Sequence, residues 1–234
     1  MKRIKSIIKR LIINSLVAKI IIRWLLRGHS FCYKWAGLMA CELNKGIHPK
    51  HDILQYKEWF LSNLLPHWTV LDIGSSNGLM PYLFSKKVAY TYGIEMNPER
   101  VETAESKYSN HNIRYFCADA TQFDYSKCQP IHCVTLSNVL EHIEDRVFFL
   151  KTLVQKINWA EINNKNFLIR VPMIDREWIV PYKKKMGMEY RLDPTHYIEY
   201  TYEEFEKELT GAGLYIKSSR ICYGEIYAIC KAKF

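Results

Sequence analysis

The sequence predicts an α/β fold in which a doubly wound, mostly parallel sheet of seven strands follows an N-terminal helical extension. From residue 69 onward, short apolar segments alternate with segments of helical periodicity, a pattern that indicates right-handed crossovers between parallel strands. The first apolar segment leads into a loop with two glycines and then into a helix. Before residue 67 only helical patterns occur, so we expect the whole sheet to lie in the rest of the chain.

Each predicted element has a local signal. Val70, Leu71 and Ile73 have the β-branched and apolar character of a buried parallel strand. Gly211 and Gly213 end the last helix, and the two final strands form a hairpin around residues 223–224. The other strands are expected at 91–94, 113–117, 131–136, 167–171, 214–221 and 225–231, and the helices of the sheet region at 79–86, 98–108, 140–158 and 202–210.

The composition indicates a globular protein with a nearly neutral body. A chain of 234 residues with 48% apolar content suits one domain with an extension. Seven cysteines without CxxC spacing argue against a disulfide framework or a zinc site and are typical of reduced thiols in a cytoplasmic protein. The net charge of +9 arises in residues 1–27, which hold eight Lys or Arg and no acid, whereas the rest carries 25 basic and 24 acidic groups. This distribution disfavours a nucleic-acid partner, which would require a basic active face.

Residues 1–28 form a basic, apolar tail. Ile4, Ile7, Ile8 and Leu11 fall on one helical face, with basic residues opposite. The longest uncharged run, at 11–18, is far shorter than the roughly 20 residues that span a bilayer, and no small-residue cleavage site follows. We therefore expect an interfacial helix on the anionic inner face of a membrane. The alternative is a helix that packs on the domain or on a partner.

Three segments are expected: the tail at 1–28, a helical cap at 29–66 and a catalytic domain at 67–234. Gly28 is expected to end the tail, a short aromatic helix to occupy 30–43, and Pro49 to begin a helix that reaches about Leu65. Ligands of open α/β sheets bind over the carboxyl ends of the strands, where such a cap can fold. Residues 172–200 are too long for an ordinary strand-to-helix connection and predict a functional lid.

The loop after the first strand, DIGSSNG at 72–78, has the features of a nucleotide-cofactor pocket. Gly74 and Gly78 let the chain turn sharply beneath a ligand. Asp72 would repel a pyrophosphate, but its carboxylate suits the cationic amino and sulfonium groups of S-adenosylmethionine. The loop resembles motif I of the class I S-adenosylmethionine-dependent methyltransferases, which have a Rossmann-like fold. This family usually shows a third small residue where Ser76 stands, so the glycine pattern is partial.

The next strand ends extend the resemblance. Glu95 lies 23 residues after Asp72, the distance at which an acid clamps ribose hydroxyls in doubly wound folds. Asp119 follows the third strand, where the family has an acid that accepts a hydrogen bond from the adenine amino group. The plain alternatives are a helix cap for Asp72 and solvated loop acids for the other two. The cofactor-binding residues that the resemblance implies are Asp72, Gly74, Ser76, Gly78, Glu95, Met96, Asp119, Ala120 and Asn138.

Three residues are candidates for catalysis on the acceptor side. His142 follows Glu141 after the fourth strand, near the donor methyl group in the resembled fold, and an imidazole can take a hydroxyl proton near neutral pH. The alternative is that Glu141 caps a helix and His142 packs against aromatic neighbours. Some class I O-methyltransferases hold a divalent metal with an ExxEH motif and a distal histidine. Here Asn138 replaces the first carboxylate, so a metal site of Glu141, His142 and His196 is less favoured than a metal-free base.

The acceptor is expected to be a sugar hydroxyl of a glycan or a lipid-linked sugar. The stretch at 137–146 and the lid at 170–201 resemble methyltransferases associated with surface-glycan clusters. Rival hypotheses are methylation of a quinone or another lipid, a nicotinamide-dependent oxidoreductase, and a non-catalytic scaffold in a glycan-assembly complex. The nicotinamide enzyme is disfavoured by Asp72 and by the absence of GxGxxG. Donors and flat apolar faces for such an acceptor are expected from Lys45, His48, Lys50, His51, Arg170, Arg176, residues 183–185, Arg191, Trp178, Tyr182 and Tyr190.

Overall fold

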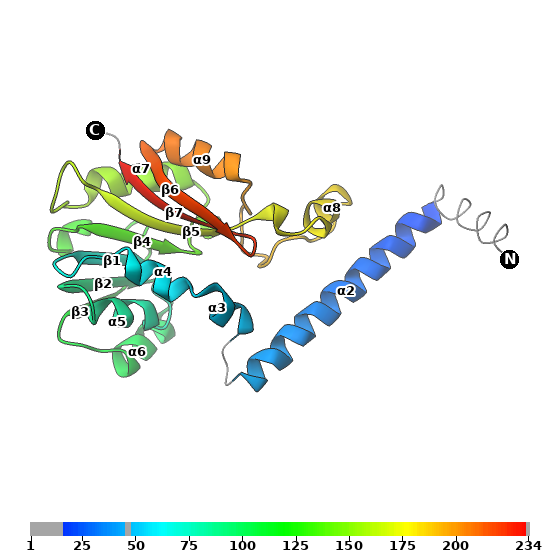
Figure 1. The fold of residues 1–234 in the computed structure, drawn as a ribbon, viewed down its shortest axis with the longest axis horizontal. Coiled ribbons are helices and arrows are strands. Elements are labelled where there is room, and N and C mark those ends of the chain that lie inside the picture. The colour runs from blue at the N-terminus through cyan, green and yellow to red at the C-terminus, as the bar shows by residue number, and fades with distance from the viewer. Residues whose placement is uncertain (1–15, 45–47, 233–234) are drawn as a thin grey trace. The chain divides into compact units, whose positions relative to one another are not determined.

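The computed structural model describes residues 16–44 and 48–232, with only the backbone described at 51 and 52. Contacts divide the chain into two compact units. One unit combines the segment up to Leu54 with Ile179–Tyr190, and the other combines Gln55–Trp178 with the chain from Arg191 onward. The second unit contains the whole sheet, and Figure 1 shows the elements of each unit.

The sheet has seven strands in the order β3-β2-β1-β4-β5-β7-β6 (Figure 1). β1 to β5 pair in parallel, and β7 is antiparallel to both of its neighbours, β5 and β6. This arrangement confirms the predicted mostly parallel, doubly wound fold. The strands are β1 (Thr69–Ile73), β2 (Tyr90–Glu95), β3 (Ile113–Cys117), β4 (Cys133–Ser137), β5 (Asn166–Pro172), β6 (Leu214–Cys222) and β7 (Glu225–Ala232).

Helices cover both faces of the sheet because successive strand residues point to opposite sides. In β1, Leu71 and Ile73 join the larger core cluster, whereas Val70 joins the smaller one. The larger cluster contains residues of α7 (Arg146–Lys156) and α9 (Tyr202–Gly211), and the smaller one contains residues of α4 (Tyr56–Ser62) and α5 (Leu79–Ser85). The remaining long helix of the unit, α6 (Pro98–Lys107), packs against β2 and β3.

The first helix differs from the prediction. A single helix, α2, runs over Leu16–Leu43, so the predicted end of the tail at Gly28 and the separate helix at 30–43 are wrong. Gly28 has ordinary helical geometry, and an isolated glycine costs only about 1 kcal/mol in a helix interior. The burial of Ala18 and Leu26 offsets this cost, so the chain continues through the glycine. The predicted face of Ile4, Ile7, Ile8 and Leu11 lies outside the described residues.

Two further helices are interrupted where continuous ones were predicted. The helix from Pro49 splits into α3 (Pro49–Leu54) and α4, because Gln55 adopts a left-handed conformation with φ of 45°. After β4, a short 3₁₀ turn at Leu140–His142 precedes α7, whose first turn is capped by the Asp145 carboxylate. The predicted helix at 140–158 therefore begins only at Arg146, and Glu141 and His142 lie on a separate turn.

The predicted lid is a folded insertion. It contains a 3₁₀ turn at Ile174–Arg176 and the helix α8 (Ile179–Lys185), and a bridge between Met173 and Tyr200 closes its base. Its middle part belongs to the unit of α2, whereas its two ends belong to the unit of the sheet. Among the described residues, no helix has the length and apolarity needed to cross a membrane.

Candidate functional site

The predicted cofactor residues gather at one edge of the sheet, where the parallel strands β1 to β4 end. The pairing register places Asp72 beside both Gly93 and Thr135, and places Glu95 beside Cys117. Because the carboxyl ends of parallel strands meet at one edge, the loops that follow them share this edge as well. The predicted residues on those ends and loops are Asp72, Gly74, Ser76, Gly78, Glu95, Met96, Asp119, Ala120 and Asn138.

The glycine loop has the backbone that its sequence predicts. Gly74 and Gly78 have φ values of 71° and 86°, in the region that favours glycine. A Cβ atom on Gly74 would lie 2.6 Å from Val139 Cγ2, and one on Gly78 would lie 2.5 Å from Ala104 Cβ. Ser76 also has a positive φ, of 50°. Both glycines are therefore required by conformation and by close packing.

Asp72 is a strongly perturbed acid at the end of β1. It is 4% exposed, and one of its carboxylate oxygens accepts a 2.5 Å hydrogen bond from Thr135 Oγ1. Burial raises the pKa of Asp72 to about 7, against the opposing effect of the Thr135 hydrogen bond. Asp72 is therefore a carboxyl group that a cationic ligand would stabilise in its charged form. Thr135 was missed by sequence reasoning, because nothing local marks a partner 63 residues away.

Glu95 connects the glycine loop to the end of β2. Its two carboxylate oxygens accept 3.0 Å hydrogen bonds from the backbone N–H groups of Ser76 and Asn97. Gly93, which was not predicted, lets the ring of Tyr115 approach, since a Cβ there would lie 2.8 Å from Tyr115 Cδ1. Glu95 thus orders the loop, and its contact with a ribose stays a prediction.

The other cofactor residues differ in exposure. Asp119 is exposed and accepts hydrogen bonds from the N–H and hydroxyl groups of Thr121, Met96 is 71% exposed, and Ala120 is partly buried. Asn138 has a φ of 56°, and its buried Oδ1 has no protein partner, like Ser75 Oγ near the start of the loop. Buried polar atoms without partners are rare in folded proteins, so these two fit an edge that accepts a polar cofactor.

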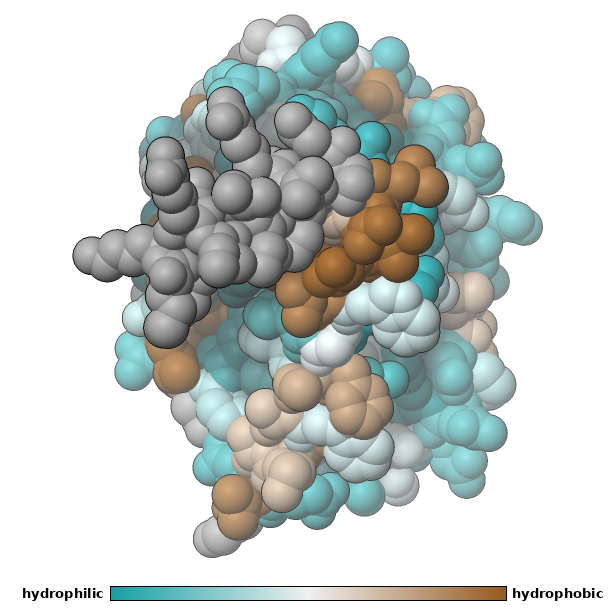
Figure 2. All heavy atoms as spheres, turned by 90° about the vertical axis from the view of Figure 1, so that its right-hand side faces the viewer, coloured by the Kyte–Doolittle hydropathy of each residue, from teal (hydrophilic) through white to brown (hydrophobic). Residues whose placement is uncertain are grey.

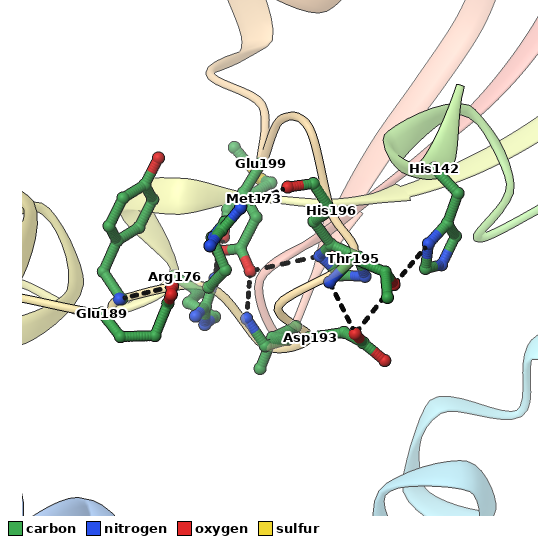
Figure 3. A network of polar contacts seen from close by, with 11 residues as sticks. His142, Met173, Arg176, Glu189, Asp193, Thr195, His196 and Glu199 are labelled. Atoms are coloured by element: carbon green, nitrogen blue, oxygen red, sulfur yellow. Dashed lines mark hydrogen bonds and ion pairs between the residues drawn. The ribbon is translucent and has the colours of Figure 1, made fainter. Parts of the chain in front are cut away.

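The three predicted catalytic residues lie together (Figure 3). The rings of His142 and His196 are 4.6 Å apart in an edge-to-face arrangement, and one ligand atom from each of Glu141, His142 and His196 lies within 4.8 Å of the others. The backbone N–H of Tyr197 donates a 2.7 Å hydrogen bond to the carbonyl of Glu141, which joins the 3₁₀ turn to the end of the insertion. The tertiary structure therefore unites residues that are 54 positions apart in the sequence.

The hydrogen bonds of Thr195 determine the tautomer of His142. Asp193 can only accept, and its carboxylate lies 2.8 Å from the Thr195 hydroxyl, which therefore donates its single proton there. His142 Nδ1 lies 3.0 Å from the same hydroxyl oxygen and must be the donor in that contact. This series of hydrogen bonds puts the ring proton on Nδ1 and leaves a lone pair on His142 Nε2. The Nε2 atom can therefore accept a proton or bind a metal ion.

The pKa of His142 fits this role. The residue keeps part of its surface exposed, yet desolvation of the ring lowers its pKa below the usual value, and the neighbouring His196 acts in the same direction. Neutral imidazole is therefore the resting form at neutral pH. Figure 3 shows His142, Thr195 and Asp193 in line, with His196 beside Glu199.

Glu141 is the least satisfied group of the site. Its side chain is fully buried, neither carboxylate oxygen has a hydrogen-bond partner, and burial raises its pKa to about 8. His196 Nδ1 is also buried and lies 3.4 Å from Glu199 Oε1. A carboxylate and two imidazoles are suitable ligands for a divalent transition metal. Ligand atoms of such an ion lie about 3 to 4 Å apart, so a small contraction would complete the site.

Several predicted acceptor-binding cations are engaged within the protein. Arg170 is 3% exposed and pairs with Glu225 at 2.5 Å, and Arg176 pairs with the buried Glu199. Burial would raise the pKa of Glu199, but hydrogen bonds from His196, Arg176 and Leu192 outweigh it and lower that pKa. Arg191 donates to the carbonyl of His196. These arginines therefore hold side chains and backbone of the protein itself. Of the other predicted donors, Lys45 and the side chain of His51 lie outside the described residues.

Comparisons with known proteins agree with this geometry. Residues 71–157 match the family model described as a methyltransferase domain, whereas no curated protein sequence matches the chain. An S-adenosylmethionine-dependent methyltransferase from Clostridium acetobutylicum has a similar structure, with a TM-score of 0.57 and 15% identity over 87% of this chain and 100% of the other. Magnesium protoporphyrin IX methyltransferase from Synechocystis, with bound S-adenosylhomocysteine, has a TM-score of 0.57 and 15% identity over 78% of this chain and 83% of the other.

A third structure, the complex of the Trm112 methyltransferase activator of Haloferax volcanii, contains a chain with a TM-score of 0.61 and 13% identity over 84% of this chain and 95% of its own. At such low identities these structures establish only the fold. The methyltransferase activity follows from the family model that matches residues 71–157. Residues 71–157 therefore form a methyltransferase domain, and the protein is an S-adenosylmethionine-dependent methyltransferase. Its cofactor is S-adenosylmethionine, which replaces the nicotinamide hypothesis.

Proposed function

We propose that this enzyme methylates a hydroxyl oxygen of a sugar in a glycan or glycolipid, with His142 as the general base. The observation that carries the proposal is the hydrogen-bonded chain from Asp193 through Thr195 to His142 Nδ1, which leaves Nε2 open. An oriented imidazole of lowered pKa beside the cofactor edge suits a hydroxyl acceptor, since a hydroxyl must lose its proton as it is methylated.

The step is a direct displacement at carbon. S-adenosylmethionine supplies the methyl group as a sulfonium electrophile. As the acceptor oxygen formed its bond to this carbon and the carbon–sulfur bond broke, His142 Nε2 would take the hydroxyl proton. Thr195 and Asp193 stabilise the resulting imidazolium through Nδ1–H, as an oriented carboxylate does in other acid–base sites. Asp72 and Glu95 would hold the cofactor at the ends of β1 and β2.

A sugar acceptor is supported by the surface of the insertion. Trp178, in the sheet unit's part of the insertion, is 75% exposed and offers a flat apolar face. Exposed aromatic faces suit the apolar faces of sugar rings. Methylation of a quinone or another lipid is the rival within the same chemistry, and the outward face of α2 described below supports a lipid-linked acceptor.

A second candidate mechanism uses a divalent metal. The buried Glu141 carboxylate without partners favours it, because an ion bound by Glu141, His142 and His196 would satisfy all three groups. Such an ion would position and acidify the acceptor hydroxyl. Both mechanisms use His142, whereas only the metal site also requires Glu141 and His196, so chelation and a variant of His196 separate them.

The test is incubation of purified protein with labelled S-adenosylmethionine and fractionated glycans, lipids and RNA, followed by mass spectrometry of the methylated product. His142→Ala should lower turnover by about 10² to 10⁴ and leave S-adenosylhomocysteine affinity unchanged. Activity that is lost on chelation, restored by a divalent ion and abolished by His196→Ala would replace the base with the metal mechanism. Methylation of lipid or RNA alone would overturn the sugar acceptor, and donor binding without any methylated product would favour the scaffold hypothesis.

A further inference from the structure

The helix α2 exposes a long apolar surface. Only Ala18 and Leu26 of its 28 residues are buried. Trp24 and Leu25 are each 67% exposed, and Figure 2 shows a brown band of apolar surface at the start of the helix. The large exposed apolar residues of the helix are Leu16, Val17, Ile20, Ile21, Trp24, Leu25, Phe31, Tyr33, Trp35, Leu38, Met39 and Leu43. Soluble surfaces rarely expose so continuous an apolar patch without a partner.

These residues share one side of the helix. At 3.6 residues per turn, most of them fall within a sector of about 140° that includes Ile20, Trp24 and Trp35. The sector contains no charge before Glu42. We call this sector the outward face, and the side that carries Ala18 and Leu26 lies away from it. At 1.5 Å per residue the helix is about 42 Å long, so the outward face is an extended stripe.

The opposite side of α2 is occupied within its own unit. The Arg23 guanidinium donates a 2.7 Å hydrogen bond to the carbonyl of Met186, and Lys183 Nζ donates a 2.7 Å hydrogen bond to Ser30 Oγ. These contacts join α2 to the α8 segment of the insertion. The outward face is therefore the side of α2 that remains for an external partner.

Cations line one edge of the outward face. Arg27 and Lys34 border the apolar sector, and Lys19 and Arg23 follow on the side of the helix that contacts the α8 segment; all four are exposed. The Arg27 guanidinium lies 5.7 Å from the ring centroid of Trp24. Five more basic residues and no acid precede the helix, at 2, 3, 5, 9 and 10.

We propose that the outward face of α2 lies in the surface of an anionic lipid bilayer. An apolar stripe with tryptophans, bordered by cations, matches an interface in which acyl chains lie below anionic headgroups. The exposed cations of α2 favour a helix that lies at the surface over one that spans the bilayer. Another protein chain would fit the apolar stripe, but it would need its own acidic border to match this edge.

This placement has a consequence for the acceptor, which rests on the proposed function. The α8 segment shares a compact unit with α2, and the same insertion continues into the segment that carries Thr195 and His196. A bilayer-bound α2 therefore brings the α8 segment to the membrane surface, and the segment with Thr195 and His196 is joined to it through the chain. An acceptor whose methylated group lies at the headgroup level, such as a lipid-linked sugar, suits this arrangement.

The experiment measures flotation of the full-length protein with vesicles of phosphatidylglycerol and phosphatidylcholine, and with vesicles of phosphatidylcholine alone. Trp24→Glu/Trp35→Glu should weaken binding to anionic vesicles by about tenfold or more, because it places two carboxylates in the apolar stripe. Phe148→Glu/Ile162→Glu is the matched control, since it removes two exposed apolar residues of the sheet unit with the same change in charge. The control should bind as the wild type does, and wild-type binding should weaken as salt rises.

Calorimetry with S-adenosylhomocysteine keeps this test separate from the proposed function, since both double variants should retain wild-type affinity. Equal loss of vesicle binding in the two double variants, or no loss in the helix variant, would overturn the proposal. Equal wild-type binding to the two vesicle types would overturn its anionic component. A wild-type dimer that dissociates on Trp24→Glu/Trp35→Glu, without vesicle binding, would assign the face to a second copy of the chain.

Discussion

At the scale of single residues, the site contains two acids whose pKa values are raised well above the ordinary range. Asp72 and Glu141 are both buried, and burial raises both pKa values, to about 7 and about 8. Burial makes each carboxyl group costly to ionise, and a bound cation would stabilise its charged form: the methyl donor for Asp72 and a metal ion for Glu141. Their positions at the cofactor and acceptor sides make them suitable probes of the two halves of the site.

The first prediction concerns the pH dependence of stability at Asp72. Its folded-state pKa lies above the unfolded value of 3.8, so the stability contribution of the protonated form is complete below about pH 4 and is lost as pH rises through 7. Asp72→Asn should therefore raise the melting temperature of the apo protein at pH 8, by the equivalent of about 2 to 4 kcal/mol, and have little effect at pH 4. Thermal denaturation at both pH values tests this, with the exposed Glu144→Gln as control. An equal shift at both pH values would contradict the burial argument.

The tautomer of His142 provides a second prediction. Nitrogen NMR should show the proton of the neutral ring on Nδ1 in the wild type, because Thr195 Oγ1 accepts it. Thr195→Val should abolish this preference and lower turnover about 10- to 100-fold, whereas Thr195→Ser should preserve both. The same tautomer in the valine variant would show that the hydroxyl does not orient the ring.

The donor side provides a third prediction. Glu95→Ala removes the acceptor of two loop N–H groups as well as the expected ribose ligand, and Gly74→Val places a side chain against Val139. Calorimetry should show S-adenosylmethionine binding at least about tenfold weaker in both, since a hydrogen bond to a charged group contributes roughly 1.5 to 3 kcal/mol. The exposed Glu144→Gln should bind as the wild type does. Unchanged affinity in Glu95→Ala would exclude that residue from the pocket.

At the scale of elements, turns and helix interiors use glycine in different ways. The hairpin between β6 and β7 turns at Tyr223 and Gly224, with φ values of 47° and 74°, and this geometry matches the twist of the strands. Gly28 in α2 has no such requirement, and an added Cβ would meet nothing within 4 Å. Replacing glycine by alanine is therefore expected to stabilise the protein at Gly28 and to destabilise it at Gly224.

A fourth prediction follows from these glycines. Gly28→Ala should strengthen α2 by about 0.5 to 1 kcal/mol, seen as slower hydrogen exchange of its amides. Gly224→Ala should destabilise the sheet unit by more than Gly213→Ala, the matched control. Gly213 and Gly224 have similar positive φ values, of 80° and 74°. An added Cβ would meet nothing within 4 Å at Gly213, but at Gly224 it would lie 2.2 Å from the Cβ of Arg176. Equal effects of the two on urea midpoints would mean that backbone strain alone decides the cost.

At the scale of the whole molecule, the two units have separate interiors. Both core clusters of the sheet unit consist only of residues from that unit, and the cofactor residues belong to it too. Because α2 is continuous to Leu43, a cut after Arg27 would divide a helix. A test of the extension must therefore remove all of it.

The fifth prediction is that deletion of residues 1–43 preserves cofactor binding. S-adenosylhomocysteine affinity should stay within about threefold of the wild type, because the deleted residues contribute nothing to the two clusters. Vesicle binding should be lost at the same time. A truncated protein that no longer binds the cofactor would show that α2 supports the pocket.

Much of this molecule could be predicted from local patterns, and the failures have a common cause. The strand at 113–117 was placed correctly, and the glycine loop and Glu95 lie where the spacing placed them, because each depends on neighbours in sequence. The break at Gln55 and the late start of α7 were missed. Both depend on packing and capping that override a periodic pattern.

The sequence by itself determined the fold class, the methyl donor and the identity of the catalytic candidates, since strand ends and residue types are local properties. Only the tertiary structure decided that His142 meets Thr195 over 53 positions and that Asp72 is held by Thr135 over 63. It also decided that the predicted arginines of the acceptor side are engaged with buried acids. Contacts between distant residues leave no periodic trace, because they depend on which strand ends and loops the fold brings together.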